Sequence, residues 1–305
     1  MSDYLILQST ILSLVLAITS VGIFISFRIL KFPDLTCDGS FPLGGAVTAV
    51  SITSGIHPLC AILLALLGGG IAGYFVGTLN AKFKVPAVVA SILVMTGLYS
   101  VNLFVLQRPQ VNFGSADTVF LEASKFLQSV VELGRLENVW VAIILLSAIV
   151  CGLILALTFF LNSIHGLRMQ MSGDSPKTAL IHGVNSKRWT GIGLFLANSL
   201  IAFSGSLLAQ YQGFADVNSG IGMVVTGLAG VFIGDALEKT VLSRKSIFVS
   251  LLFVLIGTAV YRFVLAFILA LGVESTFTNV MTSACVLLAV LLPRVQAEVR
   301  AVFRR

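Results

Sequence analysis

Long apolar runs alternate with short polar connections along this chain, and basic residues gather on every second connection. Of its 305 residues, 57% are hydrophobic and only 10% are charged, whereas water-soluble domains carry about 25% charged residues. A helix needs roughly 20 apolar residues to cross the hydrocarbon core of a bilayer. The sequence therefore predicts an all-α, polytopic membrane helical bundle that forms one domain over residues 1–305. We expect about nine transmembrane helices, at residues 5–27, 41–56, 58–78, 86–106, 139–161, 189–211, 223–237, 247–271 and 277–292.

The basic residues indicate how the bundle is oriented. Connections on the cytoplasmic side of membrane proteins are enriched in Lys and Arg, so we expect the N-terminus outside and the C-terminus in the cytoplasm. The net charge of +6 suits anionic lipid headgroups. No nucleic acid is expected as a partner, because no folded domain displays a basic face. Of the 19 basic residues, 15 follow odd-numbered helices: Arg28, Lys31, Lys82, Lys84, Arg168, Lys177, Lys187, Arg188, Lys239, Arg244, Lys245, Arg294, Arg300, Arg304 and Arg305.

Motifs for enzymatic chemistry are missing. The sequence has no GxxxxGK[ST] stretch, so a P-loop for nucleotide phosphates is excluded. A GxGxxG pattern occurs at Gly68, Gly70 and Gly73, but it lies inside an apolar run that no strand precedes, which excludes a dinucleotide-binding turn. The cysteines form no CxxC pair, and no His stands at metal-ligand spacing. We therefore expect no catalytic residues, no cofactor and no metal.

Glycines at four-residue steps predict close helix packing. Gly69, Gly73 and Gly77 share one face of a helix, and Gly230 and Gly234 repeat the spacing later in the chain. Small residues at this spacing let two helix backbones approach closely in lipid. The alternative is a flexible gate, which the pattern favours less.

The longest cytoplasmic connection contains a predicted helix at residues 173–183. Asp174 or Ser175 can cap its start, Pro176 suits the first helical position, and Gly183 can end it. A helix of about two turns outside the membrane is what a membrane domain needs to dock a separate motor. An ordinary structured loop is the equal alternative.

Ionisable residues within the predicted helices are rare. Arg262 stands alone inside a span, where it contacts substrate, reaches outward, or pairs with an acid such as Asp216 or Glu274. The near-absence of buried acids weakens an ion-coupled transporter. Polar residues within or beside the spans are candidates for a translocation path, although each can instead satisfy a neighbouring helix: Tyr99, Asn102, Asn198, Thr226 and Arg262.

An internal similarity extends this set of candidates. Four residues near the second predicted helix recur at the same offsets near the seventh, and the two copies start on opposite sides of the membrane. Inverted repeats place a substrate path at their interface, and chance similarity is the alternative. The matched residues are Asp38, Gly44, Val47 and Thr48 in the first copy, and Asp216, Gly222, Val225 and Thr226 in the second.

Residues 107–138 form a long connection on the outer side. Apolar residues recur in it at helical spacing, which predicts an amphipathic helix. Such a helix can lie in the membrane interface, as part of an outer gate or a platform for a partner, or simply cover the ends of the bundle.

Several stretches resemble the permease subunits of bacterial ABC importers. The match is to the ribose and branched-chain amino-acid permease superfamily, and within it to the tryptophan/tyrosine-type branch. It covers nearly the whole chain. The stretches are DLTCDGSFPLGGAVTAVSIT at 34–53, GGIAGYFVGTLN at 69–80, KVPAVVASILVMTGL at 84–98, MTGLYSVNL at 95–103, GDSPKTALIHG at 173–183 and ADVNSGIG at 215–222.

The resemblance implies an import permease of the type II kind that hydrolyses nothing itself. Two copies would form the translocation path, two cytoplasmic ATPase subunits would grip the helix at residues 173–183, and an extracytoplasmic binding protein would deliver the solute. The superfamily's loop pattern falls on Gly173, Ser175, Ala179 and Gly183, with Asp174 or Ser175 in place of the usual Asn. Family analogy points to an amino acid as the solute. An ion-coupled secondary transporter is the alternative, and a membrane scaffold or intramembrane enzyme ranks last.

Overall fold

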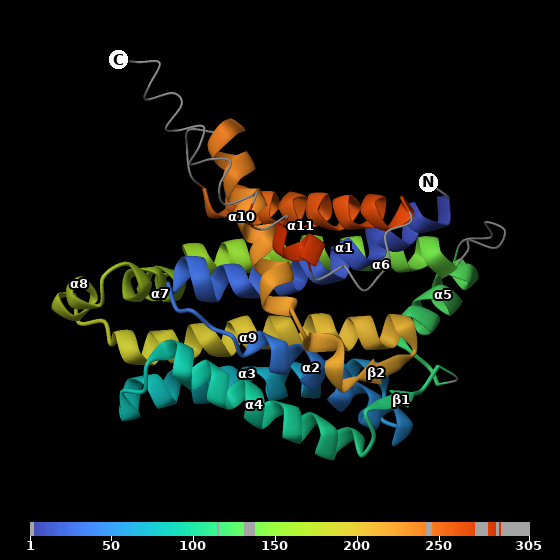
Figure 1. Ribbon diagram of the computed structural model, residues 1–305, viewed down its shortest axis with the longest axis horizontal. Coiled ribbons are helices and arrows are strands. Elements are labelled where there is room, and N and C mark those ends of the chain that lie inside the picture. The colour runs from blue at the N-terminus through green and yellow to red at the C-terminus, as the bar shows by residue number, and fades with distance from the viewer. Residues whose placement is uncertain are drawn as a thin grey trace.

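The computed structural model describes residues 3–114, 116–130, 138–241, 246–271, 280–284 and 287. It is a bundle of long, roughly aligned helices (Figure 1). The helices are α1 (Asp3–Ile23, continued by a π-helical segment, Phe24–Ile29), α2 (Cys37–Thr53), α3 (Pro58–Phe83), α4 (Ala87–Leu106), α5 (Val119–Val130), α6 (Asn138–Asn162), α7 (Ile164–Asp174), α8 (Pro176–Ile181), α9 (Ser186–Gln212), α10 (Met223–Val241) and α11 (Ile247–Ala270).

Within the described part of the chain, 7 helices are long and apolar enough to cross a membrane. The expected helix at 41–56 is α2, whose 17 residues span about 26 Å at 1.5 Å per residue, less than the roughly 30 Å of a bilayer core. The expected helix at 277–292 lies outside the described residues except for 280–284 and 287. The structure thus supports a multispanning all-α bundle, and the expected count of nine is not confirmed.

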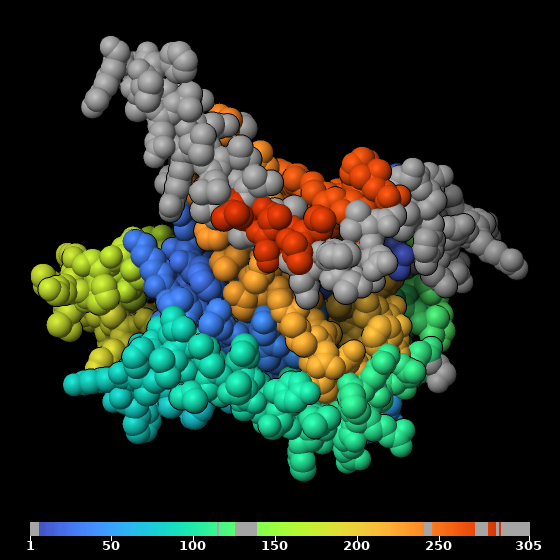
Figure 2. Space-filling model, viewed as in Figure 1, coloured from blue at the N-terminus to red at the C-terminus, as the bar shows by residue number. Residues whose placement is uncertain are grey.

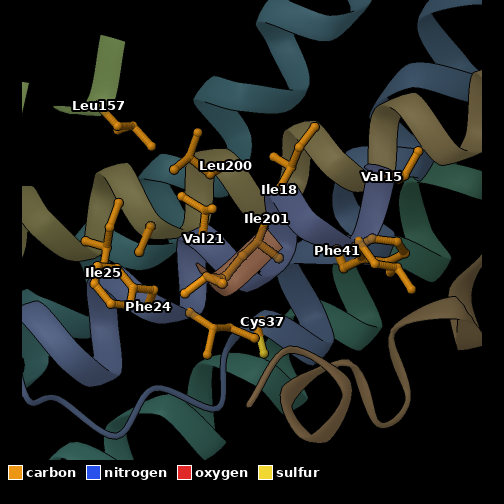
Figure 3. Packing of buried hydrophobic residues seen from close by; sticks show 14 of the residues in the cluster. Val15, Ile18, Val21, Phe24, Ile25, Cys37, Phe41, Leu157, Leu200 and Ile201 are labelled. Carbon is orange, nitrogen blue, oxygen red and sulfur yellow. The ribbon is translucent and has the colours of Figure 1, made fainter. Parts of the chain in front are cut away.

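Helix α9 is the centre of the bundle. In Figure 1 it lies between α1 on one side and α2 and α3 on the other. Its Leu200 and Ile201 pack with Ile18 and Val21 of α1 (Figure 3). Because this helix faces protein on nearly all sides, 78% of its most apolar window is buried, against 28% for α4 and α6. The outer helices keep large apolar side chains exposed, as expected where lipid is the solvent.

One short element was not expected from the sequence. Strand β1 (Gln110–Asn112) pairs antiparallel with β2 (Phe214–Asp216), with Val111 opposite Ala215. The pairing ties the connection after α4 to the end of α9, about 100 residues later. Three-residue strands carry too little alternation to be seen in the sequence. The expected amphipathic helix between 107 and 138 is α5, which lies near this ribbon (Figure 1).

Most basic residues of the described chain gather at the opposite end from β1 and β2. Arg28 and Lys239 both pair with Asp235 there, and Lys82, Lys187 and Arg188 line one cavity between α3 and α9. This is the segregation that the charge pattern predicts.

Candidate functional site

Helices α7 and α8 protrude from the basic end of the bundle (Figure 2). Ser175 is the N-cap of α8, its hydroxyl accepting a hydrogen bond from the Thr178 N–H at 3.3 Å. Pro176 takes the first helical position, where its missing N–H costs nothing. The expected short helix, with a cap at Asp174 or Ser175 and Pro176 at its first position, is α8, whose 6 residues make about two turns. Gly173 and Asp174 belong to the end of the preceding helix, α7. The extended backbone of Ser175 separates the two helices.

Helix α7 is seated on the π-helical end of α1. A Cβ added to Gly173 would overlap the carbonyl oxygen of Ile29, so the contact needs a glycine. The carboxylate of Asp174 pairs with Lys31 Nζ at 2.8 Å, and Arg168 lies over the Trp189 ring of α9 at 5.9 Å from its centroid. These contacts connect the protruding pair to both α1 and α9.

Two large apolar side chains of α8 are exposed. Ala179 is fully buried, whereas the next two residues, Leu180 and Ile181, are 73% and 84% exposed. Gly183, with a φ of +70°, turns the chain back toward α9. An exposed apolar pair on a short, well-anchored helix is suited to contact with another protein.

A second group of functional candidates lies inside the bundle, where the chain between Ile29 and α2 is not helical. Asp34 in this segment is only 1% exposed. Its carboxylate accepts hydrogen bonds from the Thr36 N–H at 2.9 Å and from the Asn198 amide at 2.7 Å. The Asn198 amide oxygen accepts a third from the Ser40 hydroxyl at 2.8 Å. The expectation that the bundle holds almost no acid is therefore wrong here, because the segment enters the bundle instead of remaining in the connection.

Asp38, in the first turn of α2, connects the start of α2 to the start of α10. Its carboxylate accepts hydrogen bonds from the N–H groups of Val224 at 2.8 Å and Gly222 at 3.2 Å, at the beginning of α10. A negative charge at a helix N-terminus is stabilising, because it meets unpaired N–H groups and the positive end of the helix dipole. The sequence pattern singled out Asp38 and Gly222, but it did not predict that they touch.

Other residues that were expected in the translocation path form hydrogen bonds or close contacts with neighbouring helices. Asn102 is fully buried and donates to the Gly39 carbonyl at 3.1 Å, and Thr48 donates to the Ser206 hydroxyl at 2.6 Å. Gly44 lies so close to the α9 backbone at Ala202 that a Cβ would overlap it. The bonds of Ser40 with Asn198 and of Thr48 with Ser206 form a polar seam between α2 and α9, and Asn102 adds a polar contact between α4 and α2.

The remaining candidates are not brought to this seam. Tyr99 is 51% exposed on α4, and Thr226 is half-buried in the first turn of α10. Arg262 lines a cavity with Gln8 and Leu12 of α1. Asp216, one of its two expected partners, instead accepts from the Asn218 N–H at 2.8 Å, and the other lies outside the described residues.

The internal similarity does not correspond to equal local structures. Asp38 is the second residue of α2, whereas Asp216 ends β2 and precedes a 3₁₀ turn, Val217–Gly220. Gly222, with a φ of +82°, stands just before α10, whereas Gly44 lies within α2. The matched positions therefore occupy different places in the two segments.

The two sets of glycines at four-residue spacing lie where α3 contacts α9 and where α10 contacts α11. A Cβ on Gly69 or Gly73 would overlap α9 near Asn198, and one on Gly77 would lie 2.7 Å from the Gly191 Cα. On α10, Gly230 and Gly234 face Thr258 and Phe253 of α11 in the same way. Each set permits backbone-to-backbone approach, the arrangement that stabilises helix pairs in lipid.

This architecture defines a multispanning membrane protein with a protruding helix pair at one end. The chain belongs to the family of permease components of branched-chain amino acid transport systems, whose sequence profile matches residues 5–292. Proteins of this family are membrane subunits of transporters and not enzymes. The resemblance inferred from the sequence is thus confirmed.

Curated relatives agree with this assignment. The chain is 35% identical over 275 residues to a tyrosine transport system permease protein of Clostridioides difficile, covering 90% of this chain and 86% of the relative. It is 30% identical over 262 residues to an uncharacterised protein of Rickettsia prowazekii, covering 86% and 88%. It is 24% identical over 292 residues to the ribose import permease protein of Escherichia coli K12, covering 94% and 84%. No solved structure matches the chain at comparable significance.

Proposed function

We propose that this chain is the membrane permease subunit of an ATP-binding-cassette importer in the bacterial cytoplasmic membrane, and that its solute is an amino acid, with aromatic amino acids as the first to test. Family membership and the similarity to a tyrosine transport permease support this proposal. Two copies of the chain form the path, an extracytoplasmic binding protein supplies the solute, and two cytoplasmic ATPase subunits drive transport. ATP binding to those subunits favours one of two states of the bundle, and hydrolysis releases it.

The observation that carries the proposal is the anchored pair α7 and α8. An ATPase that moves α8 also moves α7, and through Gly173 and Arg168 the ends of α1 and α9. Helix α9 carries Asn198 of the polar seam. A displacement of α8 can therefore be transmitted to the centre of the bundle through packed contacts.

The test is reconstitution of the chain with its ATPase and binding protein in liposomes. The variant Leu180→Ser/Ile181→Ser removes the exposed apolar pair, so we expect a roughly tenfold or greater loss of ATPase binding and loss of solute-stimulated hydrolysis. The control is Ile221→Ser, which removes a 71% exposed apolar side chain away from α8. Unchanged ATPase binding by the α8 variant would refute the coupling role of this helix.

Orientation has a separate test. The proposed arrangement places α8 in the cytoplasm and the N-terminus outside. A single cysteine at Lys177, in a background without the four native cysteines, should resist an impermeant thiol reagent in intact cells and react after lysis. Ready labelling in intact cells would show that α8 lies outside the cytoplasm, which would contradict the proposed orientation.

An ion-coupled transporter is the second candidate, because Asp34 is a buried carboxylate at the polar seam. Its hydrogen bonds to Thr36 and Asn198 account for it as a structural group. Uptake by proteoliposomes that contain this chain alone and a proton or sodium gradient would favour the second candidate. Uptake that requires the ATPase and ATP would favour the importer.

A further inference from the structure

A basic groove opens between α3 and α9 at the end of the bundle that carries α7 and α8. It encloses about 440 Å³. Lys82, in the last turn of α3, reaches it from one side, and Lys187 and Arg188, in the first turn of α9, reach it from the other. All three residues are exposed. The α3–α9 contact at Gly77 and Gly191 closes the groove toward the bundle.

The positive charge of this groove is not compensated within the described chain. No acid of the described residues forms an ion pair with Lys82, Lys187 or Arg188, and no acid lines the groove. The first turn of α9 contains no acid. Two cations therefore stand at the positive end of the α9 dipole, an arrangement that destabilises a helix unless an anion offsets it.

An apolar stripe continues from the groove along α3. Tyr74 lines the groove and is 50% exposed, and Ile71, Leu67 and Leu63 follow on the same helical face with exposures of 64%, 53% and 60%. These positions are three to four residues apart, so they form a continuous surface. A basic pocket at the membrane boundary, joined to an apolar stripe at membrane depth, matches the two halves of a phospholipid.

We propose that the groove binds the phosphate headgroup of an anionic phospholipid, whose acyl chains lie along the α3 stripe. Basic pockets between transmembrane helices are known to take such headgroups. The lipid supplies the missing negative charge at the start of α9. Because α9 also carries Asn198, the bound lipid stabilises the helix at the centre of the bundle.

The test measures lipid binding by the full-length chain in detergent, using native mass spectrometry. Phosphatidylglycerol and phosphatidylcholine with identical acyl chains are compared, and we expect a clear preference for phosphatidylglycerol. The groove variant Lys82→Gln/Lys187→Gln should lose that preference by roughly tenfold or more. The matched control is Lys84→Gln/Lys177→Gln, which removes the same charge at the same end but outside the groove, and it should retain the preference.

Three results would overturn the proposal. If both double variants lost the preference for phosphatidylglycerol equally, the preference would depend on the overall charge of the protein and not on the groove. Protection of the wild-type chain against heat by inorganic phosphate, equal to that by phosphatidylglycerol, would make the ligand a soluble anion. Intact lipid preference in the groove variant, together with weaker binding of the ATPase subunit, would make the groove a contact for an acidic protein surface. The lipid-binding and heat-protection readouts require neither transport nor the ATPase, so the first two outcomes are independent of the importer assignment.

Discussion

The side-chain amide of Asn198, in the middle of α9, donates a hydrogen bond of 2.7 Å to the carboxylate of Asp34, which precedes it by 164 residues. Asn198 also accepts from Ser40, so one side chain holds both the non-helical segment and the start of α2 against the central helix. The entry of the chain into the bundle after α1 depends on this pair. Loss of Asn198 removes the donor to one oxygen of the buried Asp34 carboxylate, which is costly because a buried polar atom is then left unpaired.

Replacement of Asn198 by Ala should lower the free energy of unfolding by about 1–3 kcal/mol, because the Asp34 carboxylate loses a charge-assisted hydrogen bond. Unfolding in detergent micelles measures the change. The variants Asp34→Ala and Asp34→Ala/Asn198→Ala complete a double-mutant cycle, with an expected coupling of about 0.5–3 kcal/mol. Additive effects would show that the pair contributes nothing of its own.

Asp38 should control local opening at the start of α10. Asp38→Ala removes the acceptor for the Gly222 and Val224 N–H groups, so their amide hydrogens should exchange faster with solvent deuterium. Asp38→Asn keeps one acceptor oxygen and should show an intermediate rate. The amides of α6, which packs against α1, α5 and α7, provide the internal reference, and unchanged exchange at Gly222 and Val224 would contradict the capping role.

Gly73 and Gly68 offer a matched comparison on α3. A Cβ at Gly73 would overlap the Leu194 carbonyl oxygen, whereas at Gly68 its nearest neighbour would be 3.7 Å away. Gly73→Ala should therefore destabilise the chain by about 1–3 kcal/mol through forced separation of α3 and α9. Gly68→Ala should be neutral or stabilising, since Ala is the better helix former. Thermal unfolding of the two variants side by side decides the point, and equal stability would argue against close packing at Gly73.

We expect Gly173 to be required for the close contact of α7 with the end of α1. Gly173→Ala would push α7 away from Ile29 and Leu30, so a disulfide engineered between α7 and the end of α1 should form more slowly than in the parent chain. Gly152→Ala on α6, where a Cβ meets nothing within 4 Å, is the control. Equal rates of crosslinking in both variants would mean that α7 tolerates a side chain at this contact.

Local patterns in the sequence predicted much of the secondary structure. The cap at Ser175 and the proline after it predicted a helix that begins there, because capping and proline effects act within one turn. The spacing of Gly69, Gly73 and Gly77 identified one face of α3, although not the helix that it contacts. The helix that precedes Ser175 was not predicted, and Gly173 and Asp174 belong to its end. Its position depends on the contact of Gly173 with the end of α1, which is far away in the sequence.

Most of the site residues could not be placed in this way. Asp34 follows Pro33 in a polar connection, so its sequence context predicts an exposed acid. It is buried because Asn198 and Thr36 supply donors, and one of these donors comes from a helix far away in the sequence. Tertiary packing likewise distinguishes two polar residues of α4 that the sequence treats alike. Asn102 is buried and donates a hydrogen bond to the Gly39 carbonyl, whereas Tyr99 stays exposed.

Hydropathy and the spacing of Lys and Arg determined that this chain crosses a membrane many times with most of its cations on one side, because transfer of each residue to lipid depends on that residue and its near neighbours. The pairing of β1 with β2, the meeting of Asp38 with α10 and the basic groove between α3 and α9 were decided only by tertiary structure. Each joins groups far apart along the chain, and their approach depends on how whole helices pack.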